Sequence, residues 1–252
     1  ASYFQHQSYN GMGCDWADYN NDAVPDLLVM DMLPETDFGQ KTMAGAMTWD
    51  KAQLIQQAGY SPQYVRNTLQ LGVQVPANTI NQTWTPGFSE IGQLAGISAT
   101  DWSWAPLFAD FDNDGWKDLF ITTGYLRNIT DKDFINYSGN LAMFKSPEQA
   151  NQDLMPKIRQ LAGKRLPNRI FQNNHALGFD ARFDAWGMTQ ASCSNGAAYA
   201  DLDKDGDLDL VVNNLNQPAF LYENKANNLL KNNYLRVKLV GDASNPSGIG
   251  AS

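Results

Sequence analysis

A nine-residue acidic segment occurs three times in the chain, and this repeat constrains the fold more than any other feature. The copies start at residues 18, 110 and 201, so they lie 92 and 91 residues apart, and they read DYNNDAVPD, DFDNDGWKD and DLDKDGDLD. Each copy follows an alanine and precedes a short apolar run typical of a β-strand. A chain with this period is expected to fold as repeated β units that pack against their neighbours.

The segments between the acidic copies also match in part. Residues 67–71 resemble residues 168–172, and each leads to a predicted Phe-containing strand, around Phe88 and Phe183, with a glycine shortly after it. Residues 37–66 and 130–166 carry Lys, Gln, Ala, Met and Leu at near-helical spacing and are interpreted as insertions. Removal of about 30 inserted residues leaves about 60 per repeat, enough for a four-stranded propeller blade.

The predicted fold class is therefore all-β with helical insertions, in which β-propeller-like blades carry Asp-rich loops. Three blades do not close a propeller of the usual four to eight, so the sequence predicts an incomplete propeller or a fragment. The chain has no initiator Met or signal-peptide pattern and stops abruptly at residues 248–252, which favours the same interpretation. The two cysteines, Cys14 and Cys193, leave the question of a disulfide open.

The acidic segments, named loop 1 (18–26), loop 2 (110–118) and loop 3 (201–209), have the composition of calcium sites. Calcium takes six to eight hard oxygen ligands in flexible geometry, which side chains at positions 1, 3, 5 and 9 and a carbonyl at position 7 can supply. The expected ligands are Asp110, Asp112, Asp114, Asp118 and the Trp116 carbonyl; Asp201, Asp203, Asp205, Asp209 and the Asp207 carbonyl; and Asp18, Asn20, Asp22, Asp26 and the Val24 carbonyl.

Among the three loops, loop 1 fits a calcium site least well. Glycine at position 6 of loops 2 and 3 permits a positive φ, but Ala23 stands there in loop 1 and Asn20 lowers its charge. We therefore expect two calcium ions, with a third site in loop 1 as an open alternative.

Other cations and other calcium motifs fit the loops less well. Magnesium demands tighter octahedral geometry, and soft metals favour thiolate or imidazole ligands, which the loops lack. An EF-hand needs a Glu at position 12, where this chain has Val29, Ile121 and Val212. A solvated acidic turn remains the alternative, although three or four carboxylates within a few ångströms repel one another without a cation.

The charge distribution agrees with cation binding and disfavours nucleic acid as a partner. The formal net charge is −9, and the three loops hold 12 of the 27 acidic residues, as three, four and five aspartates. Three divalent ions would change −9 to −3. Nucleic-acid binding rewards clustered Lys and Arg, which this sequence does not offer.

The sequence has no run of 18 apolar residues, so we predict no membrane-spanning segment.

The acidic repeats resemble the FG-GAP/VCBS repeats of integrin-α-like β-propellers, most closely at residues 108–121 and 199–212. Residues 233–241, with Asn245 and residues 248–251, resemble the opening of an ASPIC/UnbV domain, so we divide the chain into blades at 1–230 and the start of that domain at 231–252. The resemblance implies a secreted or surface protein of bacteria, outside the cell or associated with the outer membrane, with the periplasm as an alternative compartment.

Three functional hypotheses remain open from the sequence. The resemblance favours an adhesion-type binding module with structural calcium and a protein or glycan ligand. The second hypothesis is part of a polysaccharide-degrading, lyase-like enzyme, for which Tyr125, Arg127, His175 and Arg182 are the candidates without a recognisable catalytic spacing. The third is an architectural subunit of an outer-membrane transport complex. Trp102 and Trp104 could offer a sugar platform, although core packing is the simpler reading.

Overall fold

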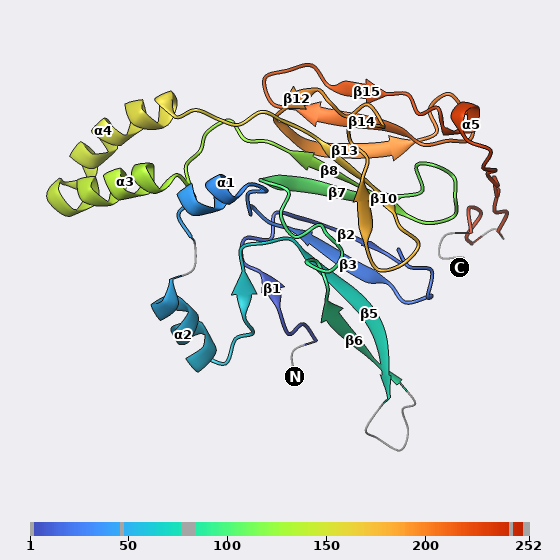
Figure 1. The fold of residues 1–252 in the computed structure, drawn as a ribbon, viewed down its shortest axis with the longest axis horizontal. Coiled ribbons are helices and arrows are strands. Elements are labelled where there is room, and N and C mark those ends of the chain that lie inside the picture. Colours follow the sequence, from blue (N-terminus) through green and yellow to red (C-terminus); the bar gives the residue numbers. More distant parts are fainter. Residues whose placement is uncertain (1–2, 46–47, 77–83, 242–243, 249–252) are drawn as a thin grey trace.

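Three antiparallel sheets follow one another along the chain in the computed structural model, which describes residues 3–45, 48–76, 84–241 and 244–248 (Figure 1). Sheet 1 is ordered β2 (Gly13–Ala17), β3 (Asp26–Met30), β5 (Thr68–Pro76) and β6 (Trp84–Glu90). Sheet 2 is ordered β7 (Ser103–Ala109), β8 (Asp118–Thr123), β10 (Arg169–Asn173) and β11 (Phe179–Ala181). Sheet 3 has β13 (Ser194–Ala200), β14 (Asp209–Asn214) and β15 (Phe220–Tyr222).

The strand register repeats from sheet to sheet, which confirms the internal repeat expected from the sequence. The residue that follows the last aspartate of each loop pairs with the third strand in the same way: Leu27 with Gln70, Leu119 with Phe171, and Leu210 with Tyr222. The predicted strands after the loops are β3, β8 and β14. The described chain is mostly β, as predicted, and the helices other than a short C-terminal one lie in the two insertions.

The first strands of neighbouring sheets pack against each other. Strand β2 contacts β7, and β7 contacts β13. The backbone N–H of Phe108 on β7 donates to the Asp15 carboxylate of β2 at 2.7 Å, so a side chain of sheet 1 binds the edge of sheet 2. Sheet 2 therefore lies between the other two (Figure 1).

Two apolar layers fill the spaces on either side of sheet 2. All six residues of β8 are buried, and successive side chains of a strand point to opposite faces. Leu119 and Ile121 accordingly pack with Leu28 and Leu69 of sheet 1, whereas Phe120 packs with Val212 of sheet 3. Burial on both faces explains why β8 reads as a continuous apolar run rather than an alternating one.

The residues around Phe183 differ from the sequence prediction. Phe183 lies in a helical turn after β11 rather than in a strand, and the strand itself is Phe179–Ala181. The matching glycines are confirmed, because Gly96 and Gly187 end equivalent turns with φ of 80° and 78°. The phenylalanine alone suggested a strand, but the turn places its ring beneath the guanidinium of Arg169, 4.7 Å from the ring centroid.

The two predicted insertions are helical, and two short ladders lie beside them. The first insertion contains α1 (Asp37–Thr42) and α2 (Trp49–Gln57), and the second contains α3 (Lys132–Phe144) and α4 (Pro147–Gln160). The remaining elements are the ladder of β1 (Gln7–Ser8) with β4 (Gln63–Tyr64), the ladder of β9 (Leu166–Pro167) with β12 (Ala191–Ser192), and α5 (Ala226–Leu229). Among the described residues, no helix is long and apolar enough to cross a membrane.

The α3–α4 pair projects from the sheets as a helical hairpin (Figure 1). Asp131 caps the start of α3 and Ser146 caps the start of α4, so local side chains specify both helices. Within the described chain neither helix buries a residue, and Met143 and Phe144 are 77% and 82% exposed. The hairpin therefore adds surface rather than core.

Replacement of residues 132–160 by a short Gly/Ser linker is expected to leave the melting temperature within about 3 °C, because the core packing stays intact. The hydrogen bond from Asn128 N–H to the Ala162 carbonyl, 2.9 Å long, would still close the base of the insertion. Phe120→Ala serves as the destabilising reference, at about 3–5 kcal/mol. A linker variant that melts as low as that reference would contradict the independence of the hairpin.

Candidate metal centres

Each acidic loop joins the first and second strands of its sheet, and the three loops fold through similar internal hydrogen bonds. The position 3 oxygen accepts the position 5 N–H, and the position 5 carboxylate accepts the position 7 N–H, in all three loops. In loops 1 and 2 the position 1 carboxylate also accepts the N–H groups of positions 5 and 6, at 2.9–3.1 Å. These bonds turn the side-chain oxygens toward the inside of each loop.

Left-handed backbone at positions 4 and 6 closes each loop. Position 4 is Asn21, Asn113 or Lys204, with φ of 57°, 58° and 68°. Position 6 has φ of 91° at Gly115 and 98° at Gly206, but loop 1 reaches 66° there with Ala23. Loop 1 thus adopts the loop conformation despite a β-carbon, at a strain of about 1–2 kcal/mol.

The aspartate at position 9 connects each loop to its sheet. Asp26, Asp118 and Asp209 are buried, and each carboxylate accepts two backbone N–H groups. One donor is position 2 of the same loop, and the other lies on or just after the third strand: Gly72, Asn173 or Asn224. The position 9 carboxylate therefore fixes the loop, the second strand and the third strand at one point.

Carboxylates converge in loops 2 and 3. Ligand oxygens of Asp110, Asp112 and Asp118 lie within 4.8 Å of one another, and so do those of Asp201, Asp203 and Asp205. Two oxygens bound to one calcium ion at about 2.4 Å can be at most about 4.8 Å apart, so this spacing fits a shared calcium ion. These two clusters can hold a metal ion. Loop 1 is not among the convergent groups of acids.

Two of the eight side-chain ligands predicted in loops 2 and 3 lie outside those convergent sets. In loop 2, Asp114 is not in the cluster, and its second oxygen lies 2.6 Å from His175 Nε2. The imidazole of His175 also stacks on Trp116, with ring centroids 5.2 Å apart. In loop 3, Asp209 is not in the cluster and its oxygens accept the two backbone bonds described above.

The side chain of Asp207 is a feature of loop 3 that sequence reasoning missed. Only its backbone carbonyl was predicted as a ligand, yet the carboxyl group is 1% exposed and lies against Asp205 and Asp209. One oxygen accepts the N–H of Asn227 at 3.1 Å, and the other has no donor among the described residues. A buried carboxylate oxygen without a partner is costly unless a cation is bound nearby.

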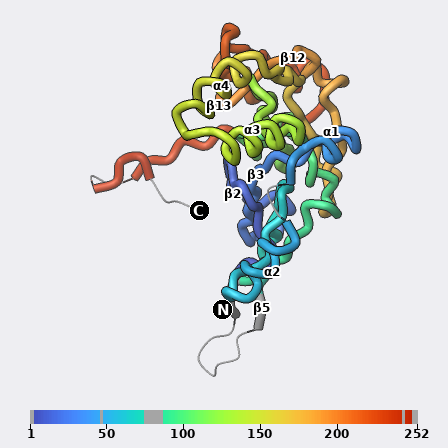
Figure 2. Tube along the Cα trace, turned by 90° about the vertical axis from the view of Figure 1, so that its left-hand side faces the viewer, coloured from blue at the N-terminus to red at the C-terminus, as the bar shows by residue number. Residues whose placement is uncertain are grey.

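The segment after α5 lies over the mouth of loop 3. Arg236 forms an ion pair with Asp201, the ring of Tyr234 lies against Gly206, and Asn232 donates to the Asp112 carbonyl at 2.8 Å. Residues 231–241 have no regular secondary structure. Figure 2 shows the C-terminal segment, in red, extending from the body of the sheets. The guanidinium of Arg236 supplies positive charge at an oxygen predicted to bind calcium.

Burial raises the pKa of several loop carboxylates. Desolvation raises the pKa of Asp118 to about 8 and that of Asp26 to about 6, and the neighbouring aspartates add to both shifts. Desolvation also raises the pKa of Asp110 and Asp112. These carboxyl groups are costly to ionise in place, and a bound cation offsets that cost.

The four residues considered for catalysis do not form one site. Tyr125 and Arg127 follow the C-terminal end of β8, whereas His175 contacts Asp114 in loop 2, just before β8 begins. The six residues of β8 between these two places span about 20 Å. Arg182 donates to Gln172, which in turn donates to Asp112.

Arg127 and Trp102 both make structural contacts within the fold. Arg127 donates to the carbonyls of Arg159 and Leu161 at the end of α4 rather than pairing with nearby Asp131. Asp131 caps α3 instead, because its side chain accepts the free N–H groups of the first turn. Trp102 is buried, which fits the core-packing interpretation.

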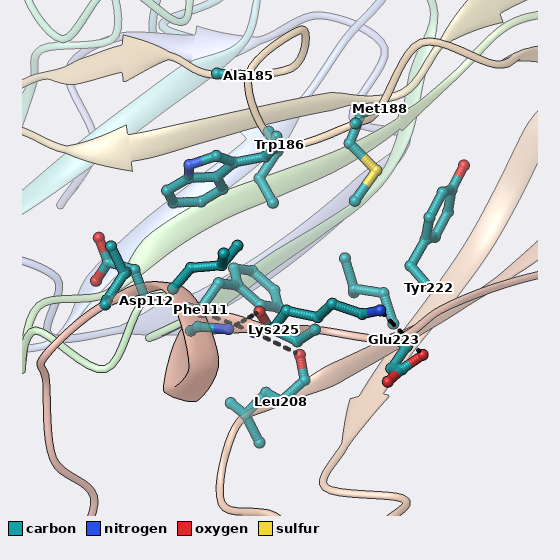
Figure 3. Close-up of a pocket in the computed structure, with 16 residues that line it drawn as sticks. Phe111, Asp112, Ala185, Trp186, Met188, Leu208, Tyr222, Glu223 and Lys225 are labelled. Carbon is teal, nitrogen blue, oxygen red and sulfur yellow. Dashed lines mark hydrogen bonds and ion pairs between the residues drawn. The ribbon is translucent and has the colours of Figure 1, made fainter.

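An apolar cavity of about 440 Å³ lies between sheets 2 and 3, beside loop 2. In Figure 3, Trp186 and Met188 face Phe111, Leu208 and Lys225 across it. Several of its lining residues belong to the apolar layer between these sheets. The cavity is therefore a gap in inter-sheet packing, and Asp112 of the loop 2 cluster borders it. The cysteines, exposed Cys14 and buried Cys193, are both free.

Comparison with known proteins adds no relative. No family model matches the chain, and a search of curated proteins found no similar sequence. The candidate sites therefore rest on the geometry of the loops.

Exchange of the position 6 residues tests the loop conformation. Ala23→Gly is expected to stabilise the protein by about 0.5–1 kcal/mol, because glycine relieves the positive φ, and Gly115→Ala is expected to destabilise it by about 1 kcal/mol. A β-carbon on Gly115 would meet nothing within 4 Å, so only backbone strain contributes. Urea unfolding measures the change in the free energy of unfolding for both variants. If both substitutions stabilised the protein, or both destabilised it, by equal amounts, the shared loop conformation would be contradicted.

The pH dependence of the chelated protein tests the buried carboxylates. A pKa raised in the folded state makes the folded protein bind a proton more tightly, so the contribution of Asp118 is greatest at low pH and is lost as pH rises to about 8. We expect the urea midpoint in EDTA to fall between pH 6 and pH 8, and calcium to reduce that fall. Asp118→Asn should flatten the EDTA profile. A midpoint that rises with pH in EDTA would contradict this assignment.

Proposed function

We propose that the chain is a calcium-stabilised β-propeller module of the FG-GAP/VCBS type that binds a protein or glycan ligand outside the cytoplasm. The observation that carries the proposal is the threefold repetition of one loop, with the same hydrogen bonds, at the same place in three successive sheets. The packing of first strand against first strand also supports a propeller, since successive blades meet along their inner strands.

Calcium has a structural role in this proposal. The ions would be held by Asp110, Asp112 and Asp118 in loop 2, and by Asp201, Asp203 and Asp205 in loop 3. Each ion would neutralise mutually repelling carboxylates, and the loop 2 ion would also tie the first hairpin of its sheet to the third strand through Asp118. Loop 1 offers fewer carboxylates and is proposed as a weaker third site.

Ligand binding is assigned to the surface that the calcium-bound sheets support. The projecting α3–α4 hairpin supports this assignment because it exposes large apolar side chains, among them Met143 and Phe144. Exposed apolar groups on an element that contributes no core are typical of interaction surfaces. A catalytic role has less support, because the candidate residues lie at opposite ends of β8.

Thermal unfolding with and without calcium tests the structural role. At a calcium concentration about 100 times the dissociation constant, each site stabilises the fold by about 2.7 kcal/mol. Two sites would raise the melting temperature by about 10–20 °C relative to EDTA. Magnesium at the same concentration should give a smaller rise.

Matched variants assign the effect to the loops. Asp112→Asn and Asp205→Asn should each remove a large part of the calcium-dependent rise, whereas Asp180→Asn removes the same charge from an exposed site outside the loops and should leave it intact. An unchanged melting temperature on adding calcium to the unmodified chain would overturn the proposed function.

A further inference from the structure

Asparagine side chains connect loop 1 to loop 2. Asn21, at position 4 of loop 1, donates its Nδ2 to the Gly115 carbonyl of loop 2 at 3.0 Å. Asn173, at the end of β10, donates its Nδ2 to the Tyr19 carbonyl of loop 1 at 2.9 Å and to the Lys117 carbonyl of loop 2 at 3.0 Å. Two asparagines therefore bind the backbones of both loops.

The same arrangement connects loop 2 to loop 3. Asn113, again at position 4, donates its Nδ2 to the Gly206 carbonyl at 3.2 Å. Asn224 donates its Nδ2 to the Phe111 carbonyl at 2.7 Å and to the Leu208 carbonyl at 3.2 Å. At both junctions the asparagine side chains donate to the same backbone carbonyls: that of position 2 in the first loop, and those of positions 6 and 8 in the next loop.

These connections end on the predicted cation ligands. The backbone N–H of Asn173 donates to Asp118 at 2.9 Å, and that of Asn224 donates to Asp209 at the same distance. The backbone N–H of each asparagine thus donates to the position 9 carboxylate of the loop in the same sheet. The side chain donates to the backbone of the preceding loop. These bonds form a continuous hydrogen-bonded route from the position 9 carboxylate of one loop to the backbone of the preceding loop.

The junction between loops 2 and 3 has an additional connection. Asn227 accepts a hydrogen bond from Asn113 and donates its Nδ2 to the Asp205 carbonyl at 2.7 Å. Its backbone N–H donates to Asp207, the buried carboxyl group whose other oxygen has no donor among the described residues. That oxygen independently indicates a cation in loop 3, and Asn227 joins it to loop 2.

We propose that loops 2 and 3 bind calcium cooperatively, with Asn113 and Asn224 as the positioning residues that couple them. This inference rests on the proposed function, because it requires both loops to bind the ion. Binding in one loop orders backbone that the other loop must also order, so the second ion meets a partly ordered site. Two loops without such connections would bind independently, apart from the screened repulsion between the ions.

Position 4 allows a matched test of the coupling. Asn113 is not a predicted ligand and has a positive φ, so Asn113→Gly removes the inter-loop bonds without backbone strain. Lys204 occupies position 4 of loop 3 with a φ of 68°, so Lys204→Gly makes the same backbone change at a residue whose side chain has no inter-loop bond among the described residues.

Terbium luminescence sensitised by Trp116 would report occupancy of loop 2, with Trp116→Phe as the control for assignment. Calcium competition gives the affinity of loop 2 with loop 3 intact and with loop 3 disabled by Asp203→Asn and Asp205→Asn. In the unmodified chain, disabling loop 3 should weaken loop 2 about 5–10-fold or more, in the range of typical coupling. In Asn113→Gly that ratio should fall to about half or less.

The outcomes separate coupling from calcium binding itself. A ratio in Lys204→Gly that stays at the unmodified value supports coupling through Asn113. The same ratio in the unmodified chain and in Asn113→Gly would overturn it, as would an equal loss in Lys204→Gly. If Asn113→Gly does not fold, Asn224→Ala, which removes the side-chain bonds of Asn224 to loops 2 and 3, should lower the same ratio, and no change there overturns the coupling. Absence of any calcium binding would overturn the proposed function as well.

Discussion

The structure depends on one buried carboxylate in each repeat, the aspartate at position 9 of the loop. Asp26, Asp118 and Asp209 each join the start of their own loop to the third strand through two backbone N–H groups. In loops 1 and 2 burial makes the charged form expensive, as the raised pKa values of Asp26 and Asp118 indicate. Hydrogen bonds alone do not offset that cost, so a fold built on this contact favours a cation beside it.

Much of the fold followed from the sequence because the repeat is written into it. The apolar runs after the loops predicted β3, β8 and β14, and the Lys-, Gln- and Ala-rich spacing predicted helical insertions. Phe183 was misplaced because one aromatic residue fits a strand or a turn equally well. The third sheet has three strands instead of four, and nothing in the composition of residues 214–230 predicted that difference.

The candidate site was predictable in its clustered carboxylates but not in the residues around them. Asp spacing identified the loops, and Gly115 and Gly206 indicated the positive φ at position 6. Contacts from distant segments gave no local signal: His175 reaches Asp114, and Arg236 reaches Asp201, across 61 and 35 residues. Such contacts join segments that lie far apart in the sequence, which no local pattern encodes.

We propose that calcium is part of the scaffold, and that ligand binding is a property of the surface that the scaffold supports. Isothermal titration of the chelator-treated chain with calcium tests that claim most directly, because it counts ions without reference to any ligand. The account predicts at least two ions bound per chain, with one lost when loop 2 or loop 3 is neutralised. No measurable binding at millimolar calcium, or binding that survives neutralisation of both loops, would contradict it.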